Sequence, residues 1–411
     1  MEHRRVGGDS TTPRQGPLTG VRVLDASTML AAPYTAGLLA DFGADVIKVE
    51  DCGTGDPMRS LSVTENGQSL FSKITNRNKR SISIDLRSDE GRDLFRRLSR
   101  EVDVVVTSFR MSTLEKWDLT YDVLSDGHPE LVMYHLSAYG PTGPRRDDPG
   151  FARVAEAYSG LTYASGEADG PPMFSGYAIA DGVGGVHGAF SVMLALYEVQ
   201  RTGRGQFVEC SLAGSMLRMM EGFFAAYDGT GVPPTRTGNR NNVVPNGIYR
   251  TADERWIVVP ATSPNMWTRL CQVLGLDHLL DDPRFTTNAD RLQHRDELEQ
   301  ILVPEFEART FDDLYTLLRD AGVAVGPVNS MEDLFADAAM WEQGALVRID
   351  DELLGRGVAM PGVVPKLSAT PGGVHHVGPE RGQQTAEVLR ELLDLSDDEI
   401  AALVAAGAIA T

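Results

Sequence analysis

The sequence has few cysteines and lacks a long apolar run. Its three cysteines, Cys52, Cys210 and Cys271, are scattered along 411 residues, which argues against a disulfide framework or a zinc site and fits a reducing compartment. No run of about 18 uninterrupted apolar residues occurs, so we expect no transmembrane helix. The segment from Met1 to Gly16 is polar and lacks the apolar stretch of a secretory signal. We therefore expect a cytoplasmic protein in which residues 1–17 form a disordered lead-in.

Positive charge is also scarce. Lysine and arginine total 38 against 58 aspartate and glutamate residues, which gives a formal net charge of -20. This balance argues against a general affinity for nucleic acid or for an anionic membrane. An anionic ligand must therefore meet a local cluster of cations or helix N-termini.

Familiar cofactor and catalytic motifs are missing. The dinucleotide fingerprint G-x-G-x-x-G does not follow the first expected strand, where the sequence runs from Asp25 to Pro33 without a glycine, so a nicotinamide dehydrogenase is disfavoured. Neither the Walker loop G-x-x-x-x-G-K-[ST] nor the H-E-x-x-H pair occurs. We predict no metal site and no permanently bound cofactor.

Short β-branched runs alternate with amphipathic segments through the first half of the chain. Strands are expected at 21–24, 45–49, 81–86, 103–107 and 131–136, and helices at 33–42 and from 88 to about 100. This alternation is typical of βαβ units and predicts an α/β fold around a mostly parallel sheet. Such sheets bind ligands beyond the carboxyl ends of their strands, so we expect the chemistry there.

A change in composition near residue 220 marks a second domain. Polar residues cluster from Thr237 to Asn242, and a strand-like run from Trp256 to Val259 follows. The tail then returns to the style of the first half. We predict a large domain at 18–220, a smaller domain at 221–365, and C-terminal helices at 366–411 that pack back onto the large domain.

The most informative segment runs from Ala178 to Phe190. Asp181 ends a short apolar run and precedes a helix whose apolar positions recur at helical spacing. Its plain interpretation is an N-cap, which stabilises a helix by about 1 kcal/mol. His187 follows one to two turns later, where we expect it to pack or hydrogen-bond locally rather than to act as a base for Asp181.

Glycines in the first turns of this helix favour a second interpretation. Each of Gly182, Gly184, Gly185 and Gly188 costs a helix about 1 kcal/mol relative to alanine, and each lets another surface approach the backbone closely. That surface is either a neighbouring helix or a ligand that reaches Asp181. Because the positive helix end favours an anion, a carboxylate there stays ionised and can act as a nucleophile.

Basic side chains gather near two strand ends. Lys79 and Arg80 precede one strand, Phe109 and Arg110 follow another, and Lys116 lies one to two turns later. Such groups can hold a pyrophosphate or meet an adenine nucleotide. A solvated surface charge or a core aromatic is the plainer interpretation of each one taken alone.

Several ordered segments carry a family resemblance. They are Gly20–Asp25, Leu39–Glu50, Asn78–Ser81, Ser159–Leu161, the segment around Asp181, and Arg201–Gln206. Together they make the sequence similar to the family III CoA-transferases, the group of formyl-CoA transferase, carnitine CoA-transferase and bile-acid-inducible protein F, with the related acyl-CoA racemases. The similarity runs from about Leu18 to Ile409.

The resemblance implies a fold, an assembly and an activity. The fold is a Rossmann-like open parallel sheet in the large domain plus a smaller α+β domain, and two chains form an interlocked homodimer. Coenzyme A, brought as acyl-CoA, is a substrate and moves to a small carboxylic acid. Asp181 takes the position of the catalytic aspartate, which attacks the thioester, forms an aspartyl anhydride and then carries CoA itself.

The resemblance also implies residues that bind CoA. Lys79, Phe109 and Lys116 fall where family members contact CoA, and Phe151 falls where transferases carry an aromatic residue near the thioester. With Arg80 and Arg110 from the basic clusters, we predict these six residues as the CoA-binding set. Racemases of the family carry a histidine at the position of Phe151, and a phenyl ring cannot move a proton. An acyl-CoA racemase or isomerase with an unidentified base is therefore the second hypothesis, and a CoA-binding protein without catalysis is the third.

Other positions depart from formyl-CoA transferase. Leu30 replaces a glutamine near its active site, and Asp51 replaces an arginine beside its CoA site. The segment 241–245 replaces its mobile glycine run. These differences argue against oxalate and formate as substrates.

Overall fold

The computed structural model of the chain describes residues 16–240 and 242–411. Most of the predicted lead-in, 1–17, and Asn241 lie outside the described residues. The chain divides into two compact units. The larger comprises the described residues up to Thr162, Phe174–Pro234 and Ala338–Thr411, and the smaller comprises Tyr163–Met173 and Thr235–Asp337.

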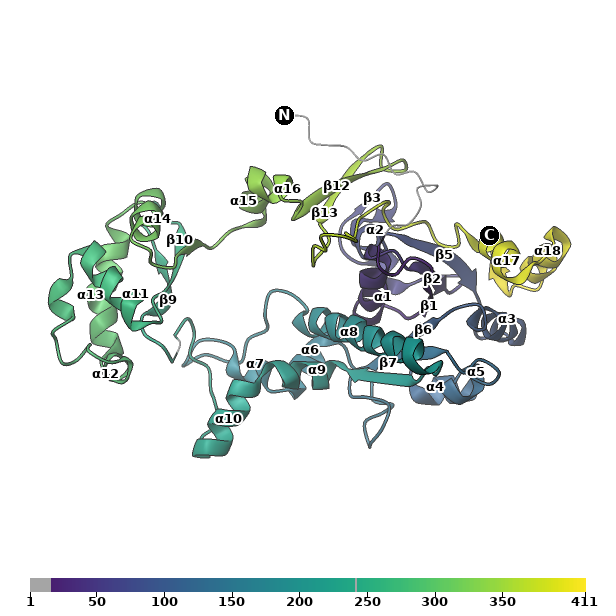
Figure 1. The fold of residues 1–411 in the computed structure, drawn as a ribbon, viewed down its shortest axis with the longest axis horizontal. Helices are drawn as coiled ribbons and strands as arrows, with labels where there is room; N and C mark the ends of the chain where they lie inside the picture. Colours follow the sequence, from purple (N-terminus) through teal and green to yellow (C-terminus); the bar gives the residue numbers. More distant parts are fainter. Residues whose placement is uncertain (1–15, 241) are drawn as a thin grey trace. The chain divides into compact units, whose positions relative to one another are not determined.

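A seven-stranded sheet organises the larger unit (Figure 1). Its order is β14-β5-β2-β1-β6-β7-β8, and every neighbouring pair is parallel except β14 with β5. The strands are β1 (Arg22–Ala26), β2 (Asp45–Glu50), β5 (Lys79–Ile84), β6 (Val104–Thr107), β7 (Val132–Ser137), β8 (Phe207–Ser211) and β14 (Ile409–Ala410). The predicted α/β class with a mostly parallel sheet is therefore confirmed.

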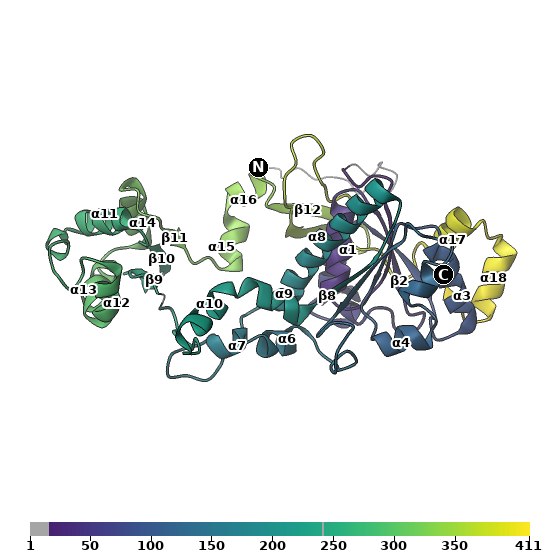
Figure 2. The same ribbon diagram turned by 60° about the horizontal axis from the view of Figure 1, so that its bottom comes forward.

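Helices cover both faces of this sheet (Figure 2). The helices of the larger unit are α1 (Ala31–Asp41), α2 (Leu70–Thr75), α3 (Asp89–Ser99), α4 (Met111–Lys116), α5 (Tyr121–Leu124), α6 (Ala152–Tyr158), α8 (Ile179–Thr202), α9 (Leu212–Met219), α10 (Glu221–Thr230), α16 (Ala338–Glu342), α17 (Thr385–Leu393) and α18 (Asp397–Ala405). Short elements complete the unit: η1 (Pro57–Ser60), the pair β3 (Thr64–Glu65) and β4 (Gln68–Ser69), and the antiparallel pair β12 (Leu346–Asp351) and β13 (Arg356–Pro361). The helix α7 (Leu161–Ala164) lies at the boundary between the two units.

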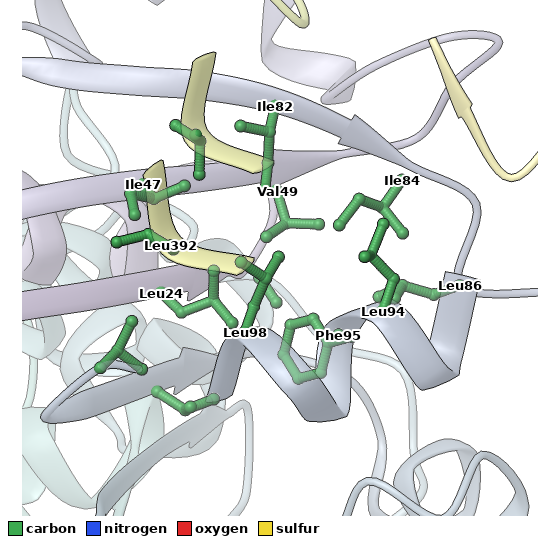
Figure 3. Close-up of a cluster of buried hydrophobic side chains, with 14 of the residues drawn as sticks. Leu24, Ile47, Val49, Ile82, Ile84, Leu86, Leu94, Phe95, Leu98 and Leu392 are labelled. Carbon is green, nitrogen blue, oxygen red and sulfur yellow. The ribbon is translucent and has the colours of Figure 1, made fainter. Parts of the chain in front are cut away.

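The sheet is buried on both faces because successive side chains of a strand point to opposite sides. Leu24 of β1 lies in a cluster with Leu98 of α3 and Leu392 of α17 (Figure 3). Its neighbour Val23 lies in the opposite cluster with Val192 of α8. Full burial of such a side chain contributes about 1.5–3 kcal/mol. The rigid sheet therefore fixes the strand ends and the helix α8, on which Asp181 lies.

The smaller unit has its own core and is an α+β structure. Its three-stranded antiparallel sheet has the order β11-β10-β9, with β9 (Asn246–Arg250), β10 (Trp256–Pro260) and β11 (Gly326–Pro327). The other elements are α11 (Pro264–Leu274), η2 (Asp277–Leu279), α12 (Asn288–Gln293), α13 (Arg295–Glu307), α14 (Phe311–Asp320) and α15 (Met331–Ala336). Phe285, Phe306 and Leu314 are among its fully buried side chains.

The contact units differ in extent from the domains predicted from composition. Residues 221–234 and 338–365 group with the larger unit rather than the smaller one. The C-terminal part of the chain also lies in the larger unit, where Thr385 Oγ1 accepts a hydrogen bond from Ser83 N of β5 at 3.1 Å. The grouping of 366–411 with the larger unit agrees with the packing expected for the tail, whereas composition gave no sign that 221–234 and 338–365 belong to it.

One helix, α8, is long and apolar enough to cross a membrane by length and composition. Its inner face nevertheless packs along α1, where Thr35 Oγ1 donates to Gly185 O at 3.0 Å. Figures 1 and 2 show the two helices side by side. We therefore assign α8 to the α/β unit as a core helix.

Candidate active site

Asp181 lies in the first turn of α8, three residues after the helix N-cap, which is Ala178. The N-cap interpretation of Asp181 is therefore wrong, because the helix begins at Ile179. Among the described residues, the Asp181 carboxylate has no hydrogen bond or ion pair, and it is neither fully buried nor fully exposed. A carboxylate at a helix start without a protein partner is available to a ligand.

The glycines of α8 separate into two kinds. A methyl group at Gly185 would lie 2.6 Å from Tyr34 Cδ1, and one at Gly188 would lie 2.3 Å from Thr35 Oγ1. These glycines, with Gly184 against Leu212, therefore allow the close contacts of α8 within the unit. A methyl group at Gly182 would meet nothing within 4 Å. The space at Gly182, the residue that follows Asp181, is therefore open.

A buried carboxylate holds the start of α8. Glu156 of α6 is 1% exposed, and its Oε1 accepts a hydrogen bond from Ala180 N at 3.2 Å. Its Oε2 pairs with Arg153 Nη1 at 2.9 Å. This contact satisfies one of the free N–H groups of the helix start and fixes the backbone next to Asp181.

The surroundings make Asp181 a weak acid that is still ionised at neutral pH. Burial, with the nearby charge of Glu156, raises the pKa of Asp181 to about 6, while Arg153 acts in the opposite direction. A raised pKa at a reacting carboxyl group is typical of functional sites. Burial, with the nearby charge of Asp181, in turn raises the pKa of the Tyr177 phenol.

Exposed aromatic rings lie in the segments that directly precede α6 and α8. Phe151 is 62% exposed, Phe174 is 56% exposed and Tyr177 is 58% exposed. The Arg153 guanidinium stacks over the Phe174 ring, with 5.0 Å between Cζ and the ring centroid. Large apolar groups that remain exposed indicate a surface that another molecule covers.

The structure places two of the predicted CoA-binding residues inside the protein. The Lys79 side chain is fully buried, and its ammonium donates to Asp25, to Asn76 and to the carbonyl of Pro33 at 2.7–3.1 Å. Arg80 is buried as well and pairs with Asp45, Glu387 and Glu391. Since carboxylates already pair with both cations, in a fully buried pair for Lys79 and in partly exposed pairs for Arg80, this geometry favours a structural role for them rather than a phosphate contact.

The other predicted binding residues are more accessible. Arg110 and Lys116 are exposed, and Phe109 is partly buried against Trp117 with 5.1 Å between ring centroids. These residues follow β6, at the carboxyl end of the sheet, where Ser108 Oγ accepts a hydrogen bond from Thr28 N at 3.0 Å. The position is the one expected for ligand binding in an open α/β sheet.

Arg153, Glu156 and Tyr177 were not predicted from the sequence. Arg153 and Glu156 are three residues apart, a spacing that indicates a helical ion pair, but the sequence gave no reason to connect them with Asp181. Tyr177 precedes the helix in a segment without a pattern that would single it out. Only the fold brings these residues together.

Residues 18–385 of the chain match the CoA-transferase family III. The chain belongs to this family. A succinyl-CoA–D-citramalate CoA-transferase from Chloroflexus aurantiacus is 40% identical over 391 residues, which cover 95% of this chain and 97% of that protein. A succinate–glutarate CoA-transferase from Agrobacterium fabrum is 35% identical and covers 92% of this chain and 96% of its own length.

A solved structure agrees with these relatives. The crystal structure of a CAIB/BAIF family protein from Brucella suis has a TM-score of 0.81 at 30% identity and covers 92% of this chain and 100% of that chain. The family III protein is thus a CoA-transferase, which moves CoA between a thioester donor and a carboxylic acid acceptor. The resemblance noted in the sequence and the activity that it implies are confirmed.

Proposed function

We propose that Asp181 is the covalent nucleophile of this CoA-transferase. The observation that carries the proposal is a carboxylate without a protein partner at the start of α8, next to the open space at Gly182. Its pKa of about 6 leaves most of it ionised at neutral pH. An ionised carboxylate can attack an acyl carbon, and covalent catalysis divides one difficult step into easier ones.

The proposed reaction needs no net proton transfer. An Asp181 oxygen bonds to the thioester carbonyl carbon, the C–S bond breaks, and CoA leaves as a thiolate. The thiolate then attacks the Asp181 carbonyl carbon of the anhydride and releases the donor acid as a carboxylate. The acceptor carboxylate attacks the resulting aspartyl thioester, which releases the thiolate and forms an anhydride between Asp181 and the acceptor. The thiolate finally attacks the acceptor carbonyl carbon of this anhydride, which gives the new acyl-CoA and restores the Asp181 carboxylate.

The names of the relatives guide the choice of substrate. Two of them act on succinyl-CoA with D-citramalate and on succinate with glutarate. Each named acid carries two carboxylates. We propose that this enzyme likewise uses a short dicarboxylic donor such as succinyl-CoA and a dicarboxylic acceptor.

The CoA moiety is proposed to bind at the carboxyl end of the sheet. Phe109, Arg110, Lys116 and Phe151 are the predicted binding residues that remain accessible to it. Aromatic and cationic side chains suit an adenine ring and its phosphates. The three free cysteines support a cytoplasmic location, because the cytoplasm keeps thiols reduced.

A second copy of the chain is the proposed partner. Val186, Phe190, Leu194 and Tyr197 form a stripe at helical spacing along α8, and each is at least 54% exposed. An apolar stripe of this kind is stable only when it is covered. The homodimer implied by the family resemblance would cover it.

Trapping tests the nucleophile. After incubation with succinyl-CoA, hydroxylamine or borohydride should modify Asp181, and peptide mass spectrometry should find the change at that residue. We expect Asp181→Ala to abolish transfer and trapping, while CoA binding measured by calorimetry stays largely unchanged.

The controls separate the alternatives. Turnover retained in the Asp181→Ala variant would contradict the proposal. Exchange of an α-proton with deuterated water, without transfer or trapping, would instead favour the racemase hypothesis. Binding of CoA with neither result would favour a non-catalytic protein.

A further inference from the structure

The guanidinium of Arg153 pairs with Glu156, the buried carboxylate of α6 that holds the start of α8. Arg153 Nη1 donates to Glu156 Oε2 at 2.9 Å and to Ser175 Oγ at 3.2 Å. Among the described residues, no hydrogen bond or ion pair uses its Nη2 or Nε. The Arg153 side chain also keeps 36% of its surface exposed. Since arginine presents five N–H donors, part of its fork remains open to an oxygen anion.

Apolar surface lies beside this open part of the fork. The ring of Phe174 stacks against the guanidinium, with 5.0 Å between the Arg153 Cζ and the ring centroid. Such stacking holds the plane of an arginine in place while its edge stays free. A fixed cation next to an exposed ring suits a short methylene chain that ends in a carboxylate.

The charge near Asp181 changes during transfer. Before reaction, Arg153 pairs with the Glu156 carboxylate, and its charge also acts on the Asp181 carboxylate. When Asp181 carries an acyl group or CoA, it is neutral, and Arg153 then faces Glu156 alone. An incoming anion therefore meets less repulsion at each acylated stage than in the free enzyme.

We propose that Arg153 binds the distal carboxylate of dicarboxylic substrates and selects short diacids over monocarboxylic acids of equal chain length. The inference rests on the proposed function, because it requires the reacting carbonyl carbon to lie at Asp181. A guanidinium holds a carboxylate through paired charge-assisted hydrogen bonds, whereas the methyl end of a monoacid gains nothing from it. Arg153 thus distinguishes the two ends of the substrate, one at the nucleophile and one at the cation.

The test compares two acceptors of equal length, glutarate and pentanoate, with succinyl-CoA as the donor. In a ping-pong reaction, kcat/KM for the acceptor reports only the half-reaction in which the acceptor enters, so effects on the donor do not interfere. Arg153→Gln should lower kcat/KM for glutarate by about 10- to 100-fold, the size expected for lost hydrogen bonds to a charged group. The value for pentanoate should change by less than about threefold. Arg153→Lys, which keeps the charge but not the fork, should give an intermediate loss.

The control is Arg145→Gln, which removes another partly exposed arginine that stacks on Tyr139 and Tyr158. It should leave the ratio of the two kcat/KM values unchanged. Thermal melting followed by circular dichroism tests whether the variants fold. If Arg153→Gln does not fold, the comparison of the two acceptors rests on Arg153→Lys.

Two outcomes overturn the inference. One is an equal loss of kcat/KM for both acceptors in the Arg153 variants, which would indicate a structural role through Glu156. The other is a kcat/KM for glutarate that stays at the wild-type value. If trapping at Asp181 succeeds in the wild-type enzyme while either outcome occurs, only the role of Arg153 fails. If trapping itself fails, the proposed function fails first.

Discussion

At the scale of single residues, the neighbours of Asp181 determine how readily it ionises. Glu156 does two things at once, because its carboxylate fixes Ala180 N and its charge disfavours a second anion nearby. Arg153 partly compensates that charge. The proposed nucleophile therefore follows a backbone group that Glu156 holds in place, and the same Glu156 makes it more basic. A more basic carboxylate is a stronger nucleophile once it is ionised.

The pH dependence of activity follows from this arrangement. Because only ionised Asp181 attacks, kcat/KM for the acyl-CoA donor should rise with pH and level off above an apparent pKa of about 6. Glu156→Gln keeps an oxygen acceptor for Ala180 N but removes the charge, so the pKa of Asp181 should fall toward its ordinary value of 3.8. Initial rates measured from pH 4.5 to pH 8 would reveal the shift.

The direction of that shift is the decisive point. A Glu156→Gln profile that moves to higher pH would show that the Glu156 charge does not act on Asp181. As a control, Glu115→Gln changes a carboxylate that pairs with Arg146 on the surface and should leave the profile in place.

Sequence reasoning proposed Asp181 as the nucleophile but did not point to Arg153, the cation whose charge acts on it. Lys79 and Arg80 had the right charge and a position beside the sheet, yet the fold gives them Asp25 and Asp45 as partners. A sequence gives the charge of each residue, but it does not give the partner with which that residue pairs in the fold. Arg153, by contrast, keeps part of its guanidinium open because Glu156 takes only one of its nitrogens.

At the scale of elements, the glycines of α8 decide how closely it approaches its neighbours. A methyl group at Gly188 would lie 2.3 Å from both Thr35 Oγ1 and Tyr134 Oη. These atoms belong to the buried side chains of α1 and β7. The separation of the two helices therefore depends on a missing side chain.

Two alanine substitutions should have opposite effects on stability. Gly188→Ala forces a methyl group into occupied space and should cost about 1–3 kcal/mol or more in the free energy of unfolding. Gly182→Ala meets open space and should stabilise the helix by up to about 1 kcal/mol. Urea unfolding followed by circular dichroism would measure both changes. Equal destabilisation by the two substitutions would contradict the assignment of Gly182 to open space.

The predicted elements agree best where apolar alternation is uninterrupted. The strands expected at 21–24 and 45–49 correspond to β1 and β2 within two residues. The strand expected at 81–86 occurs at 79–84 instead, because its first residues, Lys79 and Arg80, are charged and looked like a loop. The strand β8 went unpredicted since it is only partly buried at the sheet edge and its sequence alternates weakly.

At the scale of the whole molecule, each of the two units has a core of its own. The larger unit is assembled from three separate segments of the chain. Its domain limits could not be predicted from composition, because segments far apart in sequence share one sheet. The class of the sheet could be predicted, since it depends on local alternation alone.

The proposed homodimer gives a prediction at this scale. Sedimentation velocity should find a species of twice the chain mass at micromolar concentration. Phe190→Asp places a charge in the exposed stripe of α8 and should weaken or abolish the dimer. Met331→Asp alters an even more exposed apolar residue, which lies in the smaller unit, and serves as the control. A monomeric wild-type protein would refute the assembly.

The pairing of β5 with distant residues has a consequence for synthesis on the ribosome. Ser81 N of β5 donates to Gln384 Oε1, a residue 303 positions later, and β14 pairs with the outer edge of the same strand. While the intervening chain is still being made, this edge remains open to pairing with other nascent chains. The nascent polypeptide must therefore keep the unpaired edge of this strand shielded until nearly the whole chain has been translated.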